Sequence, residues 1–294
     1  MRFKFSYVLV FSLGLLSTGI MGLVGCSEEL PPVIMTAEEK PLLDTFYISN
    51  VPSAAVKKVL LFDVTGVRCN NCPKAAVLAK SLASSNSGRI EVVALYPKTP
   101  TSLTYPWSGF DTMSTIEAEQ IATAMGGITS LPLGAVDQVA FNGSKLLNTS
   151  DWGAAVTSQL AKTSPINITL KSTWKSADGK ARVEIKAVAN SALTANYKWV
   201  VAITESKVKS KQSDQDAPGG VVDDYDHEHA LRGVVGSTLG SDINTAAVSA
   251  GYVREKHFYV VPKAKWNAIN CDVVVWVYNV DTKEVVQVEK VALK

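Results

Sequence analysis

Cys69 and Cys72 are the residues of this 294-residue chain best suited to chemistry, because they form a CxxC pattern. A cysteine thiolate is the attacking group in thiol–disulfide exchange, and a helix N-terminus stabilises that charge and lowers the thiol pKa. Pro73 follows the pair, and proline suits the first helical position because its missing N–H has no helical partner there. The pattern therefore predicts that Cys69 lies at a helix N-terminus, as the more exposed thiol and the nucleophile.

Other states of this cysteine pair remain open. A structural disulfide is permitted in an exported protein. Zinc normally takes four ligands, usually two such pairs or one pair with two histidines, and the four cysteines of the chain include no second close pair. Cys271 stands alone beside a strongly apolar segment, so we expect it to be a buried, inert thiol. Working exchange and an inert disulfide are the two main interpretations of the pair.

A second polar group lies further along the chain, where Asp226, His227, Glu228 and His229 follow one another. In an extended segment both imidazoles would project from one face, as two metal ligands can, and the two acids would project from the other. Two strong ligands are too few for a catalytic metal centre. We therefore expect no metal and no cofactor, with histidines that bond to the backbone or pack.

The elements around the cysteine pair follow an α/β order. Residues 59–64 form a continuous apolar run that contains Asp63, as expected for a strand buried on both faces. Residues 74–83 are rich in helix-favouring Ala, Leu and Lys, and residues 90–96 form a second apolar strand. Residues 97–113 predict a loop long enough to cover the pair. Three further elements complete this part: a capped helix from Ser114, a strand entry interrupted by Pro132, and a helix that contains Trp152.

Beyond residue 162 the helical periodicity disappears. Short β-rich segments take over, at residues 166–174, 181–189, 197–204, 256–261, 273–280 and 285–293. Asp178-Gly179 links the first two and residues 281–283 link the last two, so these neighbours are predicted to be antiparallel. Such a series of short strands indicates a β-sandwich of immunoglobulin-like type. Residues 205–222 are polar and predict a long, mobile loop.

The N-terminus has the pattern of a secretory signal, in which basic residues precede a mostly apolar, uncharged run over residues 5–25. The run ends at Leu23-Val24-Gly25-Cys26, which resembles a bacterial lipobox. This resemblance implies a signal peptide over residues 1–25, lipid on Cys26, and a membrane tether over residues 26–54. The segment Ser27-Glu28-Glu29, directly after the cysteine, resembles the tag that sends some lipoproteins to the surface of anaerobic Gram-negative bacteria.

Composition limits the classes of function. Hydrophobic residues make up 47% of the chain and charged residues 19%, as in a protein with a packed core, and the length predicts two domains. The formal net charge of +2 depends on Arg2 and Lys4, and removal of these two from 29 basic residues leaves 27 against 27 acidic residues. A neutral chain gives no electrostatic reason to expect nucleic acid as a partner.

The order of the elements, with CxxC after the first long strand and an isolated proline before a terminal hairpin and helix, resembles a thioredoxin fold. This resemblance implies that Pro132 is a cis-proline beside the disulfide. It also implies that Asp63 is a buried acid that assists proton transfer at Cys72. Two departures are the missing tryptophan before Cys69 and the Asn-Asn dipeptide between the cysteines, and they leave the potency and direction of a redox reaction open.

Thr65-Gly66, the run Cys69-Asn70-Asn71-Cys72-Pro73 and the His-x-His-x-Leu-Arg pattern at residues 227–232 together resemble the outer membrane protein 28-related lipoprotein family. After the lipoprotein signal peptide, the resemblance implies an α/β thioredoxin-like domain over residues 55–164. An all-β immunoglobulin-like sandwich domain over residues 165–294 would follow. The resemblance also implies an outer-membrane, lipid-anchored location that faces the cell surface or the periplasm.

Two functions remain open. The first is a membrane-anchored protein in thiol–disulfide exchange on exported proteins, in which Cys69 would attack and Cys72 would resolve. Asp63 would handle the proton, and Pro132 would shape the substrate groove. The second is a non-enzymatic surface binding or adhesion module, with the first domain as scaffold and the sandwich in contact with a protein or glycan partner. The acids behind Cys26 favour the second, because a protein facing outward has no obvious reductase to recycle it.

We expect Cys26→Ala to release the protein from membranes or to leave it unprocessed, because acyl chains on this residue would supply the anchor. Membrane fractionation, with the mass of the mature chain, measures the effect. A variant that stays in the membrane fraction at its mature size would contradict the lipobox interpretation.

Overall fold

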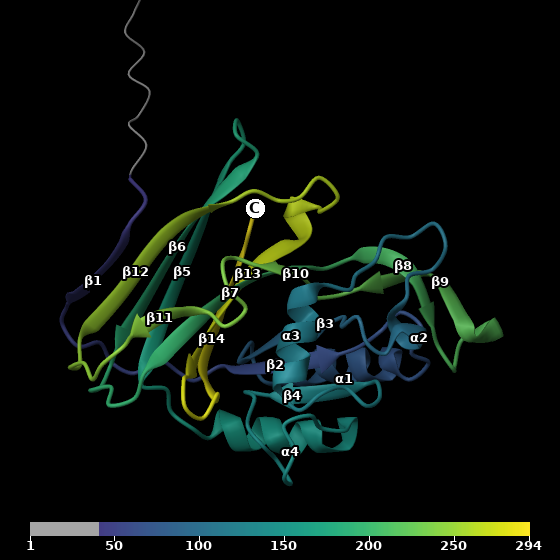
Figure 1. The fold of residues 1–294 in the computed structure, drawn as a ribbon, viewed down its shortest axis with the longest axis horizontal. Helices are drawn as coiled ribbons and strands as arrows, with labels where there is room; N and C mark the ends of the chain where they lie inside the picture. The colour runs from purple at the N-terminus through teal and green to yellow at the C-terminus, as the bar shows by residue number, and fades with distance from the viewer. Residues whose placement is uncertain (1–40) are drawn as a thin grey trace, which may run out of the picture. The chain divides into compact units, whose positions relative to one another are not determined.

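The computed structural model describes residues 41–294, whose strands form three β-sheets (Figure 1). One sheet has four strands in the order β1-β12-β6-β5. A second has eight strands along the path β14-β13-β7-β10-β3-β2-β4, with β11 beside β7, and the third consists of β8 and β9. The predicted signal peptide and Cys26 lie outside the described residues. Within those residues, no helix is long and apolar enough to cross a membrane.

The bounds of the elements are as follows. The helices are α1 (Cys72–Ser85), α2 (Thr101–Thr104), α3 (Ile116–Ala124) and α4 (Thr149–Leu160), with short 3-10 turns at Pro218–Gly220 and Ala268–Asn270. The strands are β1 (Asp44–Ile48), β2 (Val59–Val64), β3 (Ile90–Leu95), β4 (Leu133–Val136), β5 (Ile166–Lys175), β6 (Lys180–Ala189), β7 (Tyr197–Glu205), β8 (Val208–Ser213), β9 (Val221–His227), β10 (Ala230–Val234), β11 (Ser241–Asn244), β12 (Tyr252–Val260), β13 (Cys271–Asn279) and β14 (Val285–Ala292).

Strands β2 and β3 are parallel and are joined through α1, while β4 pairs antiparallel with the other edge of β2. Every residue of these three strands is buried, because side chains pack against both of their faces. On one face, Leu61 shares a core with Ala79 of α1 and Trp152 of α4. On the other, Phe62 shares a core with Ile121 of α3. The predicted strand, helix and strand around the cysteine pair are confirmed.

A second core lies between the two sheets, where strands β5, β6 and β12 pack on strands β7 and β13. Ile185 and Val275 are fully buried there, and Trp199 is 1% exposed. Strands β5 and β6 are antiparallel across Asp178-Gly179, and β13 and β14 are antiparallel neighbours in the same way, so both predicted hairpins are confirmed.

Strand β10 joins the two parts of the chain into one sheet. It pairs antiparallel with β7 on one side and parallel with β3 on the other, where Ala94 N donates to His229 O at 2.9 Å. The segment just before it, predicted as a mobile loop at residues 205–222, instead forms the antiparallel hairpin of β8 and β9. That prediction is wrong because Gln212 of β8 donates to backbone carbonyls of the cysteine turn, and Ser210 and Gln212 are buried while Lys209 faces solvent.

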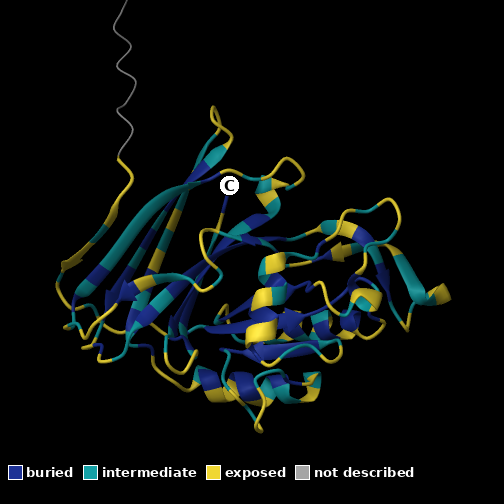
Figure 2. Ribbon diagram, in the orientation of Figure 1, coloured by how far each residue is buried: buried dark blue, intermediate teal, exposed yellow. Residues whose placement is uncertain are grey.

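Part of the predicted tether is also a strand. Residues Asp44–Ile48 form β1, which pairs antiparallel with β12 at the edge of the four-stranded sheet. Figure 2 shows this edge strand mostly exposed, in contrast to the buried strands at the centre of the eight-stranded sheet. The aromatic and β-branched residues of β1 suit a strand, which a sequence assignment based on the nearby prolines overlooked.

Candidate functional site

The cysteine pair forms a disulfide with sulfurs 2.09 Å apart, and Cys72 begins α1. Cys69 lies in the preceding turn, where its N–H donates to Gly66 O at 3.0 Å and its carbonyl accepts from Cys72 N at 3.2 Å. Because proline fits the first turn of a helix, Pro73 is compatible with a helix that starts at the second cysteine. The prediction that Cys69 occupies the helix N-terminus is therefore wrong.

Both cysteines are buried, each with 2% of its surface exposed. Gln212 of β8 lies against the turn that carries the first of them, and its Nε2 donates to Cys69 O at 3.0 Å and to Gly66 O at 3.2 Å. Next to it, Ser213 N donates to Val67 O at 2.9 Å. The prediction that Cys69 is the more exposed thiol is therefore wrong, because β8 packs on its turn.

The loop at residues 97–113 packs against the same turn, although α2 interrupts it. Arg68 N donates to Leu103 O at 2.9 Å, and Trp107 Nε1 donates to Val67 O at 3.2 Å. The Arg68 guanidinium also lies 4.0 Å from the centre of the Trp107 ring, a cation–π arrangement. The turn before the disulfide is thus fixed by contacts from two segments far apart in the sequence.

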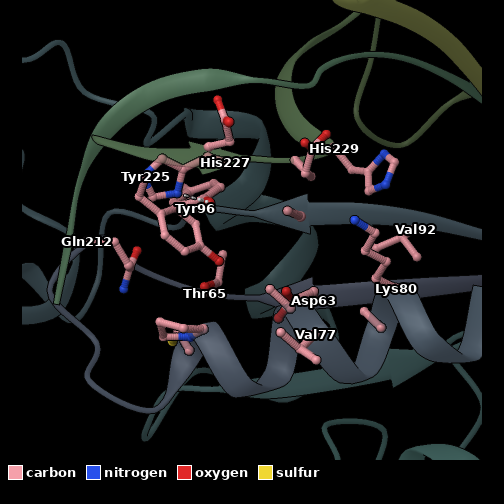
Figure 3. A pocket seen from close by; sticks show the side chains of 17 residues that line it. Asp63, Thr65, Val77, Lys80, Val92, Tyr96, Gln212, Tyr225, His227 and His229 are labelled. Carbon is pink, nitrogen blue, oxygen red and sulfur yellow. Dashed lines mark hydrogen bonds between the residues drawn. The ribbon is translucent and has the colours of Figure 1, made fainter. Parts of the chain in front are cut away.

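A cavity of about 490 Å³ lies beside the disulfide, bounded by α1, by strands β2 and β3, and by β9 (Figure 3). Cys72 lines this cavity and Cys69 does not, so the two sulfurs have different surroundings. The titratable side chains around the cavity include Asp63, Lys80, Tyr96, Tyr225, His227 and His229. The cavity therefore brings together three groups that the sequence singled out separately: the second cysteine, the strand acid and the two histidines.

Asp63 lies in β2 and is 3% exposed. Its neighbours two residues away in the strand, such as Leu61, pack toward α1, and alternation directs Asp63 to the same face. Among the described residues no donor meets its Oδ1, and burial without such a donor raises the pKa of this carboxyl to about 7. An acid with that pKa takes up or releases a proton at neutral pH, and it shares the cavity with Cys72.

The two histidines reach the cavity by different backbone conformations. His227 ends β9, is 1% exposed, and its Nδ1 lies 3.0 Å from Tyr96 Oη in a hydrogen bond. His229 has a positive φ of 54°, so the two residues do not continue one extended strand as expected. Desolvation lowers both pKa values to about 4, which leaves both rings neutral at pH 7. One nitrogen of each ring, Nε2 of His227 and Nδ1 of His229, has no partner within the described part of the chain.

Two other predicted residues lie away from the cavity. The Leu131–Pro132 peptide is cis, and the pairing of Val64 with Leu133 puts this proline just before the start of β4, near the turn that precedes the disulfide. Pro132 does not line the cavity. Cys271 is fully buried, unpaired, and burial raises its pKa to about 12, so the prediction of a buried, inert thiol is confirmed.

Tyr96, Gln212 and Tyr225 are among the residues of the site that were not singled out from the sequence. Tyr96 ends an apolar strand, where an aromatic residue is ordinary. The other two belong to the hairpin of β8 and β9, whose polar composition is typical of a loop and does not predict strands. No group of three or more His, Cys, Asp and Glu side chains placed to hold a metal ion occurs among residues 41–294.

Comparison with known proteins assigns the family. A family model described as outer membrane protein Omp28 matches residues 120–294, more than half of the chain. The chain belongs to the outer membrane protein Omp28 family. This assignment confirms both the predicted family and the predicted location at the outer membrane. The Omp28 match includes Pro132 and the two histidines but begins after the CxxC motif, so the family assignment does not depend on the cysteine pair.

Solved structures resemble the Omp28 chain at low sequence identity. HBP35 of Porphyromonas gingivalis is 15% identical with a TM-score of 0.62, covering 82% of this chain and 77% of that one, which shows a shared fold. An Agrobacterium tumefaciens protein is 12% identical with a TM-score of 0.47, over 82% of this chain and 96% of that one. A domain of the outer membrane lipoprotein Omp28 from Porphyromonas gingivalis is 22% identical with a TM-score of 0.30, over 45% of this chain and 89% of that one. No curated protein matches.

The raised pKa of Asp63 makes folding stability depend on pH. The folded state holds this proton more tightly than the unfolded state, so the favourable contribution is complete below about pH 4 and is lost as pH rises toward 7. Asp63→Asn should therefore raise the free energy of unfolding at pH 8 by up to about 4 kcal/mol relative to the natural protein, and much less at pH 4.

Urea denaturation at both pH values measures this effect. Asp281→Asn, in the exposed turn after β13, is the matched control and should keep the natural pH dependence. If Asp63→Asn raised the free energy of unfolding equally at pH 4 and pH 8, the carboxyl would not be the buried, proton-binding group described.

Proposed function

We propose that this Omp28 family protein is a lipid-anchored thiol–disulfide exchange protein that acts on exported proteins. The observation that supports it best is the shared cavity of Cys72 and Asp63, because a leaving thiolate needs a proton and this acid holds one near neutral pH. The anchor in this proposal is lipid on Cys26, consistent with the family's location at the outer membrane.

The arrangement around the pair supports a thioredoxin-like assignment for residues 55–164. Strands β2 and β3 are parallel through α1, β4 runs antiparallel beside β2, and α4 follows. The cis peptide at Pro132 precedes β4, near the turn before the disulfide. The sandwich that follows has the antiparallel hairpins of an immunoglobulin-like fold, and that finer class is also part of the proposal.

The exchange step follows from the asymmetry of the pair. A substrate thiolate attacks the Cys69 sulfur, a bond forms between these two sulfurs, and the Cys69–Cys72 bond breaks. The electron pair leaves with Cys72 as a thiolate, which takes a proton from Asp63 across the cavity. A second thiolate of the substrate then attacks the mixed disulfide, releasing the oxidised substrate and the Cys69 thiolate.

This step requires movement of the hairpin of β8 and β9, because both sulfurs are buried beneath neighbouring segments. Polar contacts hold the hairpin on the turn. They include the Gln212 and Ser213 hydrogen bonds, a bond from Gln215 N to Asn70 O at 3.2 Å, and the exposed Lys74–Asp216 ion pair at 3.0 Å. Exposed ion pairs contribute little to stability, so the hydrogen bonds matter more, and Gln212 supplies those that come from a side chain.

A binding module in which the disulfide is structural is the second candidate. The 2% exposure of both cysteines favours it, since a buried disulfide resists attack. The protein or glycan partner of such a module would contact surfaces away from the pair. The two candidates differ in one measurable respect, which is whether Cys69 ever reaches a substrate.

Cys72→Ala should capture mixed disulfides through Cys69 in cells, because exchange is reversible: the Cys69 thiolate can still attack a substrate disulfide, and the Cys72 sulfur that would release the substrate again is gone. Non-reducing electrophoresis and mass spectrometry of the captured species measure this. The control is the double variant Cys69→Ala, Cys72→Ala, which retains only Cys26 and the buried Cys271 and should capture nothing. Absence of capture by Cys72→Ala, also when combined with Gln212→Ala, would leave the binding module as the function.

Gln212→Ala should increase the rate at which dithiothreitol reduces the Cys69–Cys72 disulfide by about thirtyfold. The reason is that its lost hydrogen bonds to the turn, each contributing about 1 kcal/mol, no longer oppose opening of the hairpin. Gln215→Ala is the matched control, because it is exposed and keeps its backbone bond to Asn70. Equal reduction rates in the two variants would show that the hairpin does not control access.

A further inference from the structure

The cavity beside the disulfide is larger than proton transfer to one sulfur requires. Its volume of about 490 Å³ lies within the range of about 300–1,000 Å³ typical of small-molecule sites. Apolar side chains, including Val77 and Val92, line part of it, and polar and titratable side chains line the rest (Figure 3). A cavity of this size, with polar groups beside apolar walls, can hold a small polar ligand.

The charge of the cavity is unbalanced. Asp63, at 3% exposure, has no hydrogen-bond donor for Oδ1 within the described residues. Asp226 and Glu228 line the outer part, and Asp226 is already paired with Lys209 at 3.1 Å. Lys80 is the lining residue that carries positive charge, and it lies on the exposed side of α1. An ionised buried carboxylate without a countercharge is unfavourable, and a ligand that carries positive charge and N–H donors would satisfy it.

The remaining polar groups also suit a cation. Both histidines are neutral at pH 7, so they do not repel positive charge. Tyr96, Tyr225 and His227 form an aromatic group, with ring centres 5.8 Å apart for Tyr96 and His227 and 4.8 Å apart for Tyr225 and His227. Aromatic faces attract ammonium groups. An anionic ligand would instead meet the carboxylates of Asp63 and Glu228.

We propose that this cavity binds a small organic cation, a primary amine whose ammonium group pairs with Asp63 and whose short carbon chain lies against Val77 and Val92. A metal ion does not fit, because residues 41–294 contain no group of three suitable ligands. The site is complete in the oxidised protein and does not depend on thiol–disulfide exchange.

Isothermal titration of the oxidised protein with n-butylamine at pH 8 tests the proposal. At this pH the carboxyl of Asp63, with its pKa raised to about 7, is mostly ionised before the ligand binds. The expected result is saturable binding of one amine per chain. Titrations with n-butanol and butyrate, which have the same carbon chain without the positive charge, should show at least tenfold weaker binding.

Variants locate the binding site. Asp63→Asn should weaken amine binding at least tenfold, and Glu228→Gln should weaken it less, because Glu228 is exposed and solvent screens its charge. Asp281→Asn, outside the cavity, should bind as the natural protein does. The titrations contain no thiol, so binding is measured in the absence of exchange, which separates this inference from the exchange function. Equal affinity for amine and alcohol, or full affinity in folded Asp63→Asn, would overturn the proposal.

Discussion

The pairing of β10 with two strands at once is the constraint on which the rest of the site depends. Its bonds to β7 on one edge and to β3 on the other make one sheet from segments that are far apart in the sequence. The hairpin of β8 and β9 leaves this sheet at the end of β7 and returns to it at β10. Because both ends of the hairpin are fixed in strands, its polar residues are held on the CxxC turn and over the adjacent cavity.

The same sheet maintains a buried acid that is unfavourable by itself. Asp63 is surrounded by fully buried apolar residues of β2, such as Phe62, and its ionised form has no countercharge nearby. A second buried acid, Asp137, differs from Asp63 because both of its oxygens have partners. Its Oδ2 lies 2.7 Å from Lys57 Nζ, its Oδ1 accepts from Leu60 N at 2.8 Å, and both residues of the ion pair are buried. Asp137 fixes strand positions through these bonds, whereas the unpaired Asp63 retains a proton to exchange.

The sequence predicted those elements whose signals are local. Apolar runs marked β2 and β3, and Asp178-Gly179 marked a hairpin, because burial and turn chemistry leave their pattern in neighbouring residues. The β8 and β9 hairpin was predicted as a loop because its sequence is polar. Gln212 is buried by hydrogen bonds to the distant Cys69 turn, and a glutamine in a polar segment does not indicate such burial. The prediction that Cys69 is the more exposed thiol was wrong for the same reason. The pairing of β10 with both β7 and β3 joins segments that are far apart in the sequence, and no local pattern encodes it.

One hairpin therefore contacts the disulfide from two directions. Gln212 of β8 binds the carbonyl of Cys69, whereas Tyr225 and His227 of β9 line the cavity that Cys72 faces. The hairpin movement that we propose would also disturb the wall of the cavity beside the second sulfur. A ligand bound against β9 would then stabilise the closed hairpin, and by reciprocity an open hairpin would bind that ligand less tightly. The two proposals thus link access to the disulfide with occupancy of the cavity through one structural element.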